Sequence, residues 1–202
     1  MDSTPSDLFE RPRLASTASE GLKIVIIGGF GVGKTTLVQA VSEIRPLSTE
    51  ETMTRAGEGV DNPRIGTGKT STTVAFDFGR ISLSPERVLY LFGAPGQERF
   101  WFLWDRLFLG SLGAVVLVDA RRLDDSFYAI DRLEASGTPF IVARNRFGRT
   151  HHSLDAVRGA LRLGDHIPLI DCDARDRQSC KDVLIALVEH LFTLHSTREA
   201  VS

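Results

Sequence analysis

The chain has 202 residues, which is enough for one domain with a sizeable hydrophobic core. Hydrophobic residues make up 42% and charged residues 25%, and these ordinary values exclude a wholly disordered protein. With 24 Lys and Arg against 26 Asp and Glu, the net charge of -2 lacks the surplus of base that a general nucleic-acid binder needs.

The two cysteines are too few for a disulfide framework, so we expect reduced thiols and a cytoplasmic protein. The sequence offers neither an apolar run long enough to span a membrane nor a common lipid-attachment motif. We therefore expect no direct membrane anchor, and recruitment to a membrane only through a partner protein.

The chain divides into a flexible N-terminal tail at residues 1–20, a single domain at 21–195 and a short C-terminal tail at 196–202. Residues 22–27 form a β-branched run that is typical of a strand buried on both faces. Glycines follow at once, and residues 34–41 have helical character. Residues 42–68 show little apolar periodicity, so we expect a long irregular loop there.

Residues 72–83 and 88–92 predict a hairpin, and three further buried strands are expected at 114–118, 140–143 and 167–170. Helical patterns lie between them, including one that is opened by Ser179 with Asp182 three residues later, close to a capping box. Strands that alternate with helices indicate an α/β fold of three layers. The expected sheet has six strands and is mostly parallel, with one antiparallel edge strand and helices on both faces.

One segment matches the phosphate-binding pattern G-x-x-x-x-G-K-[ST], and it stands between the first strand and the first helix as that pattern requires. Its residues are Gly28, Gly29, Phe30, Gly31, Val32, Gly33, Lys34 and Thr35, followed by Thr36. The glycines allow backbone N–H groups to surround phosphate oxygens, and the helix N-terminus adds partial positive charge. Lys34 is predicted to reach the β- and γ-phosphates, and the Thr35 hydroxyl to bind Mg²⁺.

A second G-K-T triplet, at 68–70, lacks this context. Pro63 stands where the first glycine of the pattern belongs, and a β-rich run follows instead of a helix. We therefore expect residues 66–70 to be an ordinary flexible loop.

Five segments together resemble the bacterial small Ras-like GTPases of the gliding-motility (Mgl) type, and more closely the conservon GTPases. They are residues 28–36, 73–79, 91–102, 116–122 and 172–175, within a match that runs from about 22 to about 192. The resemblance implies a P-loop NTPase with a Ras-like G domain that alternates between GTP and GDP states with Mg²⁺. It also implies partners of the Roadblock/LC7 type and a sensor histidine kinase-like protein.

The same resemblance implies roles for the residues around the γ-phosphate. Thr73 would bind Mg²⁺ and sense the γ-phosphate, Gly96 would offer its backbone N–H to it, and Gln97 would orient the attacking water. Gly93 departs from the small-GTPase pattern D-x-x-G-Q, because it stands where an aspartate usually helps to hold Mg²⁺. The resemblance implies that glycine is usual at this position in the Mgl and conservon GTPases.

The base-binding segment departs further from the small-GTPase pattern N-K-x-D. Asn145 matches and is expected to order the loop, Arg146 is expected to stack on the purine, and the Ala174 N–H is expected to face the base oxygen. Gly148 stands where an aspartate would accept two hydrogen bonds from guanine. Without this aspartate, the preference for guanine should be weaker by on the order of 10²-fold.

The aromatic stretch at 100–108 follows Gln97 directly. Helical spacing predicts one buried face, made of Phe100, Trp104, Leu107 and Phe108. Trp101 or Phe102 is then left near the surface, where a protein-docking surface is an open alternative to simple burial.

These motifs favour a small GTPase that hydrolyses GTP slowly and acts as a signalling switch. The alternative is a pseudo-GTPase, or an ATP/GTP-binding docking module with little hydrolysis, which Gly93 and Gly148 favour. A small-molecule kinase is less favoured because Gln97 follows Pro95-Gly96 and no arginine-rich lid is apparent. An arginine for catalysis could come from Arg55, Arg64 or a partner.

Overall fold

The computed structural model describes residues 18–45, 47–54, 71–148 and 152–201. The tail residues 1–17, the second G-K-T triplet, Arg55 and Arg64 lie outside these ranges. The strands are β1 (Glu20–Ile27), β2 (Leu47–Thr54), β3 (Ser71–Ser82), β4 (Arg87–Gly93), β5 (Gly113–Val118), β6 (Phe140–Asn145) and β7 (Leu169–Cys172). The helices are α1 (Lys34–Val41), the 3-10 helix η1 (Glu98–Leu103), α2 (Trp104–Phe108), α3 (Asp124–Ser136), α4 (Leu154–Leu161) and α5 (Arg177–Val201).

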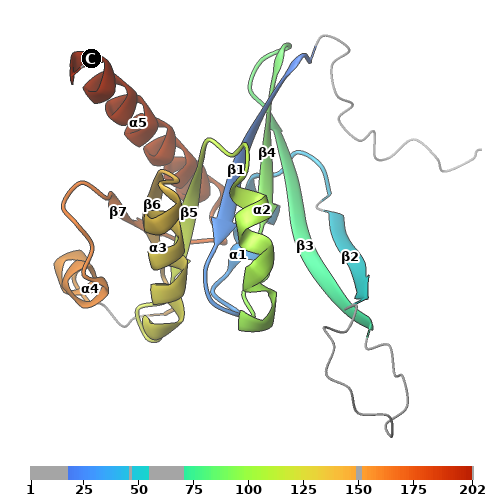
Figure 1. The fold of residues 1–202 in the computed structure, drawn as a ribbon, viewed down its shortest axis with the longest axis horizontal. Helices are drawn as coiled ribbons and strands as arrows, with labels where there is room; N and C mark the ends of the chain where they lie inside the picture. The colour runs from blue at the N-terminus through green and yellow to red at the C-terminus, as the bar shows by residue number, and fades with distance from the viewer. Residues whose placement is uncertain (1–17, 46, 55–70, 149–151, 202) are drawn as a thin grey trace, which may run out of the picture.

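The described strands form one sheet in the order β2-β3-β4-β1-β5-β6-β7 (Figure 1). The strand β1 pairs in parallel with β4 and β5, and β6 and β7 continue the parallel part. Only β3 runs against the others, and it pairs with β2 on one side and with β4 on the other. The predicted α/β fold with a mostly parallel sheet and one antiparallel strand is therefore confirmed.

The sheet has seven strands among the described residues, one more than the sequence predicted. The additional strand, β2, lies within the segment 42–68 that was expected to be irregular. Its sequence, LSTEETMT, is polar and carries no apolar alternation, and an edge strand can form because backbone hydrogen bonds to its neighbour suffice. As a result, β2 occupies the edge of the sheet and β3 lies inside it. The sequence had predicted that the antiparallel strand would be at the edge.

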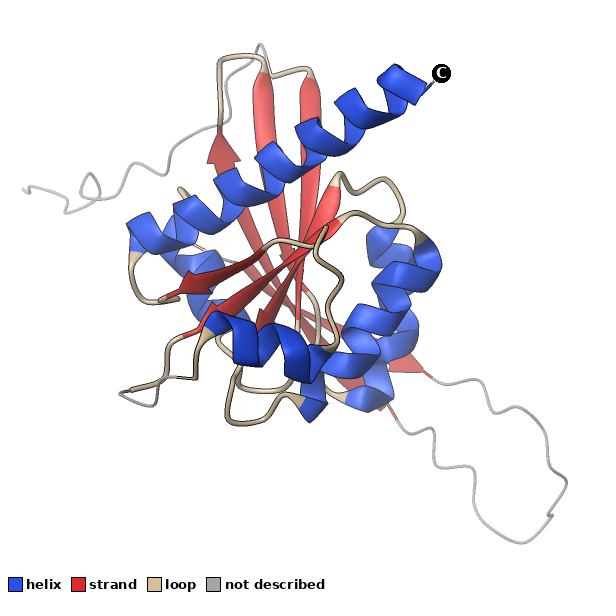
Figure 2. Cartoon of the chain, turned by 90° about the vertical axis from the view of Figure 1, so that its left-hand side faces the viewer, coloured by secondary structure: helices blue, strands red, loops and turns tan. Residues whose placement is uncertain are grey.

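Helices cover both faces of the sheet (Figure 2) and give two separate cores. Alternate residues of β1 enter different cores, as the pleat of a strand requires. Ile24 and Ile26 pack with α1 and α5, whereas Val25 and Ile27 pack with α2, α3 and α4. Because β1 is buried on both faces, the loop that follows it starts from a fixed position.

The last two elements begin elsewhere than the sequence predicted. The strand β7 begins at Leu169, two residues late, and α5 begins at Arg177, capped by Asp176, whose carboxylate accepts hydrogen bonds from the N–H groups of Gln178 and Ser179. The Ser179 hydroxyl instead accepts a hydrogen bond from the Asp173 N–H at 2.9 Å. The helix α5 continues to Val201, through most of the residues assigned to a C-terminal tail.

Within the part of the chain that the structure describes, no helix has both the length and the apolar character needed to cross a bilayer.

Candidate nucleotide-binding site

The phosphate loop predicted at 28–35 connects β1 to α1, and the helix begins at Lys34. Gly33 precedes the helix with a φ of 105°, a left-handed conformation that favours glycine. An added Cβ at Gly33 would also lie 2.5 Å from Asn145 Nδ2. The glycine thus allows the loop to approach the base-binding segment closely.

Lys34 is buried at the centre of this loop, although it carries a charge. Its Nζ donates hydrogen bonds to the carbonyl oxygens of Gly28 at 2.9 Å and Gly29 at 2.7 Å. Burial lowers the pKa of Lys34 to about 8, and the charge of Asp77 acts in the opposite direction. A buried amine that donates to two carbonyl oxygens is well suited to receive an anion.

The predicted γ-phosphate sensor lies beside this lysine. An added Cβ at Gly96 would stand 2.5 Å from Lys34 Nζ and 2.7 Å from the Gly29 carbonyl oxygen, so only glycine fits. The loop at 94–97 is held there by two hydrogen bonds, from the Ala94 N–H to the Ile26 carbonyl at 2.8 Å and from Trp104 Nε1 to the Pro95 carbonyl at 3.1 Å. The structure therefore brings Gly96 to the phosphate loop, with the half-buried Gln97 next in sequence.

The aromatic stretch anchors this loop. Phe100, Trp104 and Phe108 are buried, as the helical spacing predicted, and Trp104 also contacts the Tyr128 ring. Phe102 is 53% exposed, which confirms that this residue remains near the surface. The side chain of Trp101 lies outside what the structure describes.

Asp77, in the middle of β3, is a site residue that the sequence analysis missed. The Thr35 hydroxyl donates a hydrogen bond to Asp77 Oδ2 at 2.6 Å. In the β3–β4 ladder Asp77 pairs with Gly93, and an added Cβ at Gly93 would lie 2.8 Å from Asp77 Cβ. A carboxylate from the neighbouring strand therefore occupies the space that an aspartate side chain at position 93 would need.

The donor set beside Lys34 fits a magnesium ion, because a Thr hydroxyl and a carboxylate are the hard oxygen ligands that Mg²⁺ prefers. Thr35 and Asp77 supply these two groups in direct contact. Thr73 lies four residues before Asp77 in the same strand, about 13 Å along β3, and its side chain lies outside what the structure describes. Its role as a ligand stays a prediction.

The base-binding segments also meet at the phosphate loop. Asn145, the last residue of β6, donates through Nδ2 to the Val32 carbonyl at 2.9 Å and accepts through Oδ1 from the Ala174 N–H at 3.0 Å. One buried side chain thus joins the loop after β1 to the loop after β7. In this arrangement the Ala174 N–H, which was predicted to face a base oxygen, is directed to Asn145.

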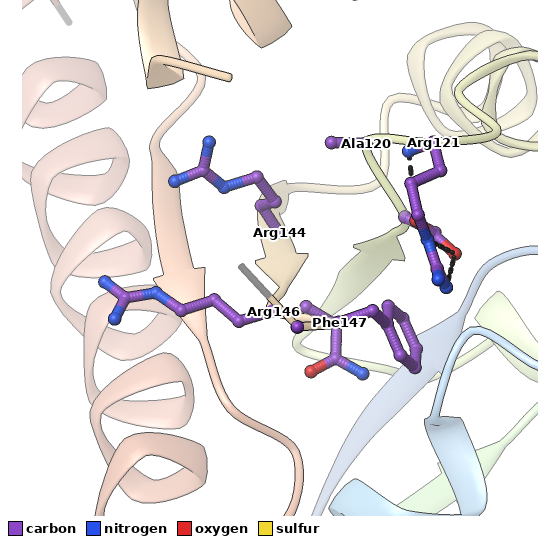
Figure 3. Close-up of a pocket in the computed structure, with 8 residues that line it drawn as sticks. Ala120, Arg121, Arg144, Arg146 and Phe147 are labelled. Carbon is purple, nitrogen blue, oxygen red and sulfur yellow. Dashed lines mark hydrogen bonds and ion pairs between the residues drawn. The ribbon is translucent and has the colours of Figure 1, made fainter. Parts of the chain in front are cut away.

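Arg146 extends toward β7 and away from Phe147, on the same side as Arg144 (Figure 3). Both arginines hold Asp171, with Arg144 Nε at 2.7 Å from Oδ1 and Arg146 Nη2 at 2.8 Å from Oδ2. Burial tends to raise the pKa of Asp171, but the hydrogen bonds from the two arginines outweigh it and the pKa is lowered. The structure therefore places Arg146 against a carboxylate, not in the stacking position predicted for it.

Arg144 and Arg146 line one side of a pocket, and Arg121 and Phe147 line the other side (Figure 3). The centroid of the Phe147 ring lies 4.6 Å from the guanidinium carbon of Arg121. Arg121 is fixed by Asp119, which accepts hydrogen bonds from its backbone N–H and its guanidinium. Asp119, which directly follows β5, thus has a structural role. Gly148 has a φ of 75°, and an added Cβ would meet none of the described residues within 4 Å.

Comparisons with known proteins agree with a nucleotide site in this fold. A family model described as "conserved hypothetical ATP binding protein" matches residues 26–194. An uncharacterized protein of Methanocaldococcus jannaschii, MJ1339, is 28% identical over 128 residues, which are 62% of this chain and 70% of that protein.

Among solved structures, the FeoB G-domain from Methanococcus jannaschii superposes with a TM-score of 0.55 at 14% sequence identity. The alignment covers 85% of this chain and 98% of that domain, and it shows a shared fold. The phosphate loop, its buried lysine and the family match identify a nucleotide-binding domain of the P-loop NTPase kind. The chain belongs to the family of conserved hypothetical ATP binding proteins.

Proposed function

We propose that this domain binds GTP with Mg²⁺, hydrolyses it slowly and acts as a nucleotide-dependent signalling switch. The observation that carries the proposal is the contact of the glycine at 96 with Lys34, which brings a sensor loop to the phosphate loop. In such switches the loop adopts one arrangement around a triphosphate and another around a diphosphate, and a partner protein reads the difference.

The hydrolysis is an in-line attack of water on the γ-phosphorus, with little covalent chemistry for the protein to perform. Lys34 and the N–H groups of the phosphate loop stabilise the charge that develops on the phosphate oxygens. The side chain of Gln97 orients the water, and the Gly96 N–H holds the γ-phosphate in line. Thr35 and Asp77 would hold Mg²⁺, which supplies neutralising charge at the β- and γ-phosphates.

A second candidate function is a docking module that binds ATP and GTP alike and hydrolyses little. Two observations favour it, the open space at Gly148 and the engagement of Arg146 with Asp171. Neither Gly148 nor Arg146 supplies the charged acceptor that distinguishes guanine from adenine.

Calorimetric titration of the protein with GTP, GDP and ATP in excess Mg²⁺ separates the two candidates. The switch predicts tighter binding of the guanine nucleotides and measurable phosphate release from GTP. Equal affinity for GTP and ATP, with no phosphate release, would contradict it and support the docking module.

The mechanism has its own test in Gln97→Leu. This variant should keep its affinity for GTP and lose most of its phosphate release, since only the water loses its partner. Gln178→Leu, an exposed glutamine in the first turn of α5, is the matched control and should release phosphate at the unchanged rate. Unchanged turnover in Gln97→Leu would remove this residue from the mechanism.

A further inference from the structure

An arginine from the turn between β5 and α3 contacts the phosphate loop. Arg122 Nη2 donates a hydrogen bond to the Phe30 carbonyl oxygen at 2.9 Å. The Arg122 N–H donates to the Asp119 carbonyl, also at 2.9 Å, and this bond closes the turn. The Arg122 side chain is 51% exposed, so it approaches the loop from the solvent side. A residue far from the loop in sequence therefore holds one of its carbonyl groups from a fixed position.

This contact decides which way one peptide group of the loop faces. The C=O and N–H groups of a trans peptide point in opposite directions, so the bond from Arg122 to the Phe30 carbonyl directs the Gly31 N–H away from the arginine. The same arrangement recurs two residues later, where Asn145 Nδ2 holds the Val32 carbonyl at 2.9 Å. Because backbone N–H groups bind the phosphates in such a loop, each of the two side chains fixes the orientation of one donor.

The glycine at position 31 gives this restraint its importance. A peptide group reverses by rotation about the ψ of the residue before it and the φ of the residue after it, and glycine adopts both signs of φ readily. Gly31 has a φ of 73°, and among the described residues an added Cβ would meet only Arg122 Nη2, at 3.9 Å. Packing by the described residues thus does not oppose a reversal, which would turn a carbonyl group toward the phosphates.

We propose that Arg122 is a positioning residue of the nucleotide site, which keeps the Gly31 N–H directed at the phosphates by holding the Phe30 carbonyl. The guanidinium lies on the carbonyl side of the peptide, so it acts through the backbone and does not itself touch the nucleotide. Its effect on affinity requires only a phosphate loop that binds nucleotide, whereas any effect on hydrolysis rests on the proposed function.

The position of Arg122 also has a consequence for charge. Asp125, in the first turn of α3, lies against the loop, because an added Cβ at Gly29 would be 3.1 Å from Asp125 Oδ2. Arg122 Nη1 lies 3.8 Å from the same oxygen. A carboxylate beside the loop repels a phosphate group, and the guanidinium offsets this repulsion. A test must therefore separate the charge of Arg122 from its hold on the peptide.

Arg122→Met keeps much of the length of the side chain and removes both the hydrogen bond and the charge. Affinity is measured in excess Mg²⁺ with a fluorescent analogue of GDP or ADP, whichever the unmodified protein binds more tightly. It should fall about tenfold in this variant, because one phosphate donor is no longer held in place. Arg122→Lys keeps a charged donor and should recover most of the affinity.

The orientation of the peptide has a spectroscopic signature of its own. In ¹⁵N-labelled protein, the nucleotide should shift the Gly31 amide proton downfield, because this N–H donates to a phosphate oxygen. We expect a much smaller shift in Arg122→Met at saturating nucleotide. A side chain that only stabilised the fold would leave this shift unchanged.

Arg158→Met is the matched control. Arg158 also donates to backbone carbonyl groups, those of Gly164 at 2.8 Å and Ile167 at 3.0 Å, but these lie between α4 and β7 and not in the phosphate loop. The control should lower the midpoint of thermal unfolding and leave the affinity unchanged. Asp125→Asn removes the repelling charge, and adding Arg122→Met to it should still weaken binding several-fold.

Unchanged affinity in Arg122→Met, or an equal loss in Arg158→Met, would overturn the positioning role. Equal affinity of Asp125→Asn with and without Arg122→Met would also overturn it, because the whole effect would then come from charge. Slower hydrolysis with unchanged affinity and an unchanged Gly31 shift would identify an arginine that contacts the γ-phosphate directly, which contradicts the proposal as well.

Failure of the proposed function can be told apart from failure of this inference. If the protein released no phosphate from GTP, the signalling switch would fail, while the affinities and the Gly31 shift would still decide the role of Arg122. A protein that bound neither GDP nor ADP would overturn both.

Discussion

At both the phosphate end and the base end of this site, glycine stands where the small-GTPase pattern has aspartate, yet the two positions differ. At Gly93 there is no room for a side chain, because Asp77 from the neighbouring strand fills the space. At Gly148 a Cβ would meet no atom within 4 Å in the part of the chain that the structure describes. The first end keeps a carboxylate supplied from another strand, whereas the second lacks one at the corresponding position. Loss of a motif residue therefore indicates loss of its chemistry only where no neighbouring side chain supplies the group.

Gly148→Asp tests the base end of the site, and we expect the largest effect from this substitution. The substitution restores a charged acceptor at an open position, and Asp tolerates a positive φ better than most residues. We expect the ratio of GTP to ATP affinity, measured by calorimetry, to rise by about 10²-fold. Gly148→Asn has nearly the same shape without the charge and is the matched control. An equal rise in both variants would exclude the charge as the cause.

A smaller effect is expected from Asp77→Asn, which keeps the size of the side chain beside Thr35 and removes its charge. The Mg²⁺ concentration that gives half-maximal GTP binding should rise about tenfold, because the metal loses an anionic ligand. The double substitution Asp77→Gly with Gly93→Asp moves the carboxylate to the position usual in small GTPases. It should return the Mg²⁺ concentration for half-maximal GTP binding to that of the unmodified sequence. Unchanged Mg²⁺ dependence in Asp77→Asn would contradict the view that Asp77 supplies the carboxylate at the phosphate end.

The smallest effect concerns the pH dependence of nucleotide affinity. Phosphate favours the protonated amine, so binding raises the pKa of Lys34 from its value of about 8 and takes up a proton. Affinity should therefore fall as pH rises through this range, by about fourfold between about pH 7 and 8.5.

Lys34→Arg serves as the reference for this measurement, because its guanidinium stays protonated over the whole range. Its affinity for GDP should be independent of pH, whatever its absolute value. A slope in Lys34→Arg equal to that of the unmodified sequence would assign the titration to another group.

The parts of the molecule that the sequence predicted are those whose signals are local. The phosphate loop is a contiguous motif between a strand and a helix, and the buried strands are apolar runs, so each could be recognised in its own segment. The contact between Asn145 and the phosphate loop could be anticipated only through the resemblance, because the segments are far apart in sequence.

The features that were missed depend on pairing across the sheet. The strand β2 is polar and exists because β3 offers it hydrogen-bonding partners. Asp77 is part of an otherwise strand-like run, and its importance follows only from its register opposite Gly93. A charged residue in the middle of a strand, with a glycine in the strand that returns from the hairpin, was the available signal. Asp176 was missed as the cap of α5 because Ser179 fitted a capping pattern three residues later.

The position of Asp77 within β3 separates two properties that are otherwise linked. An aspartate at position 93 would join the metal directly to the start of the sensor loop, so any change in that loop would also change the affinity for the ion. Here the carboxylate belongs to a strand with hydrogen-bonded neighbours on both sides. The residues at 94–97 could thus vary in sequence or conformation while a bound ion would keep Thr35 and Asp77 as ligands, so that the affinity for the cation need not depend on the order of this loop.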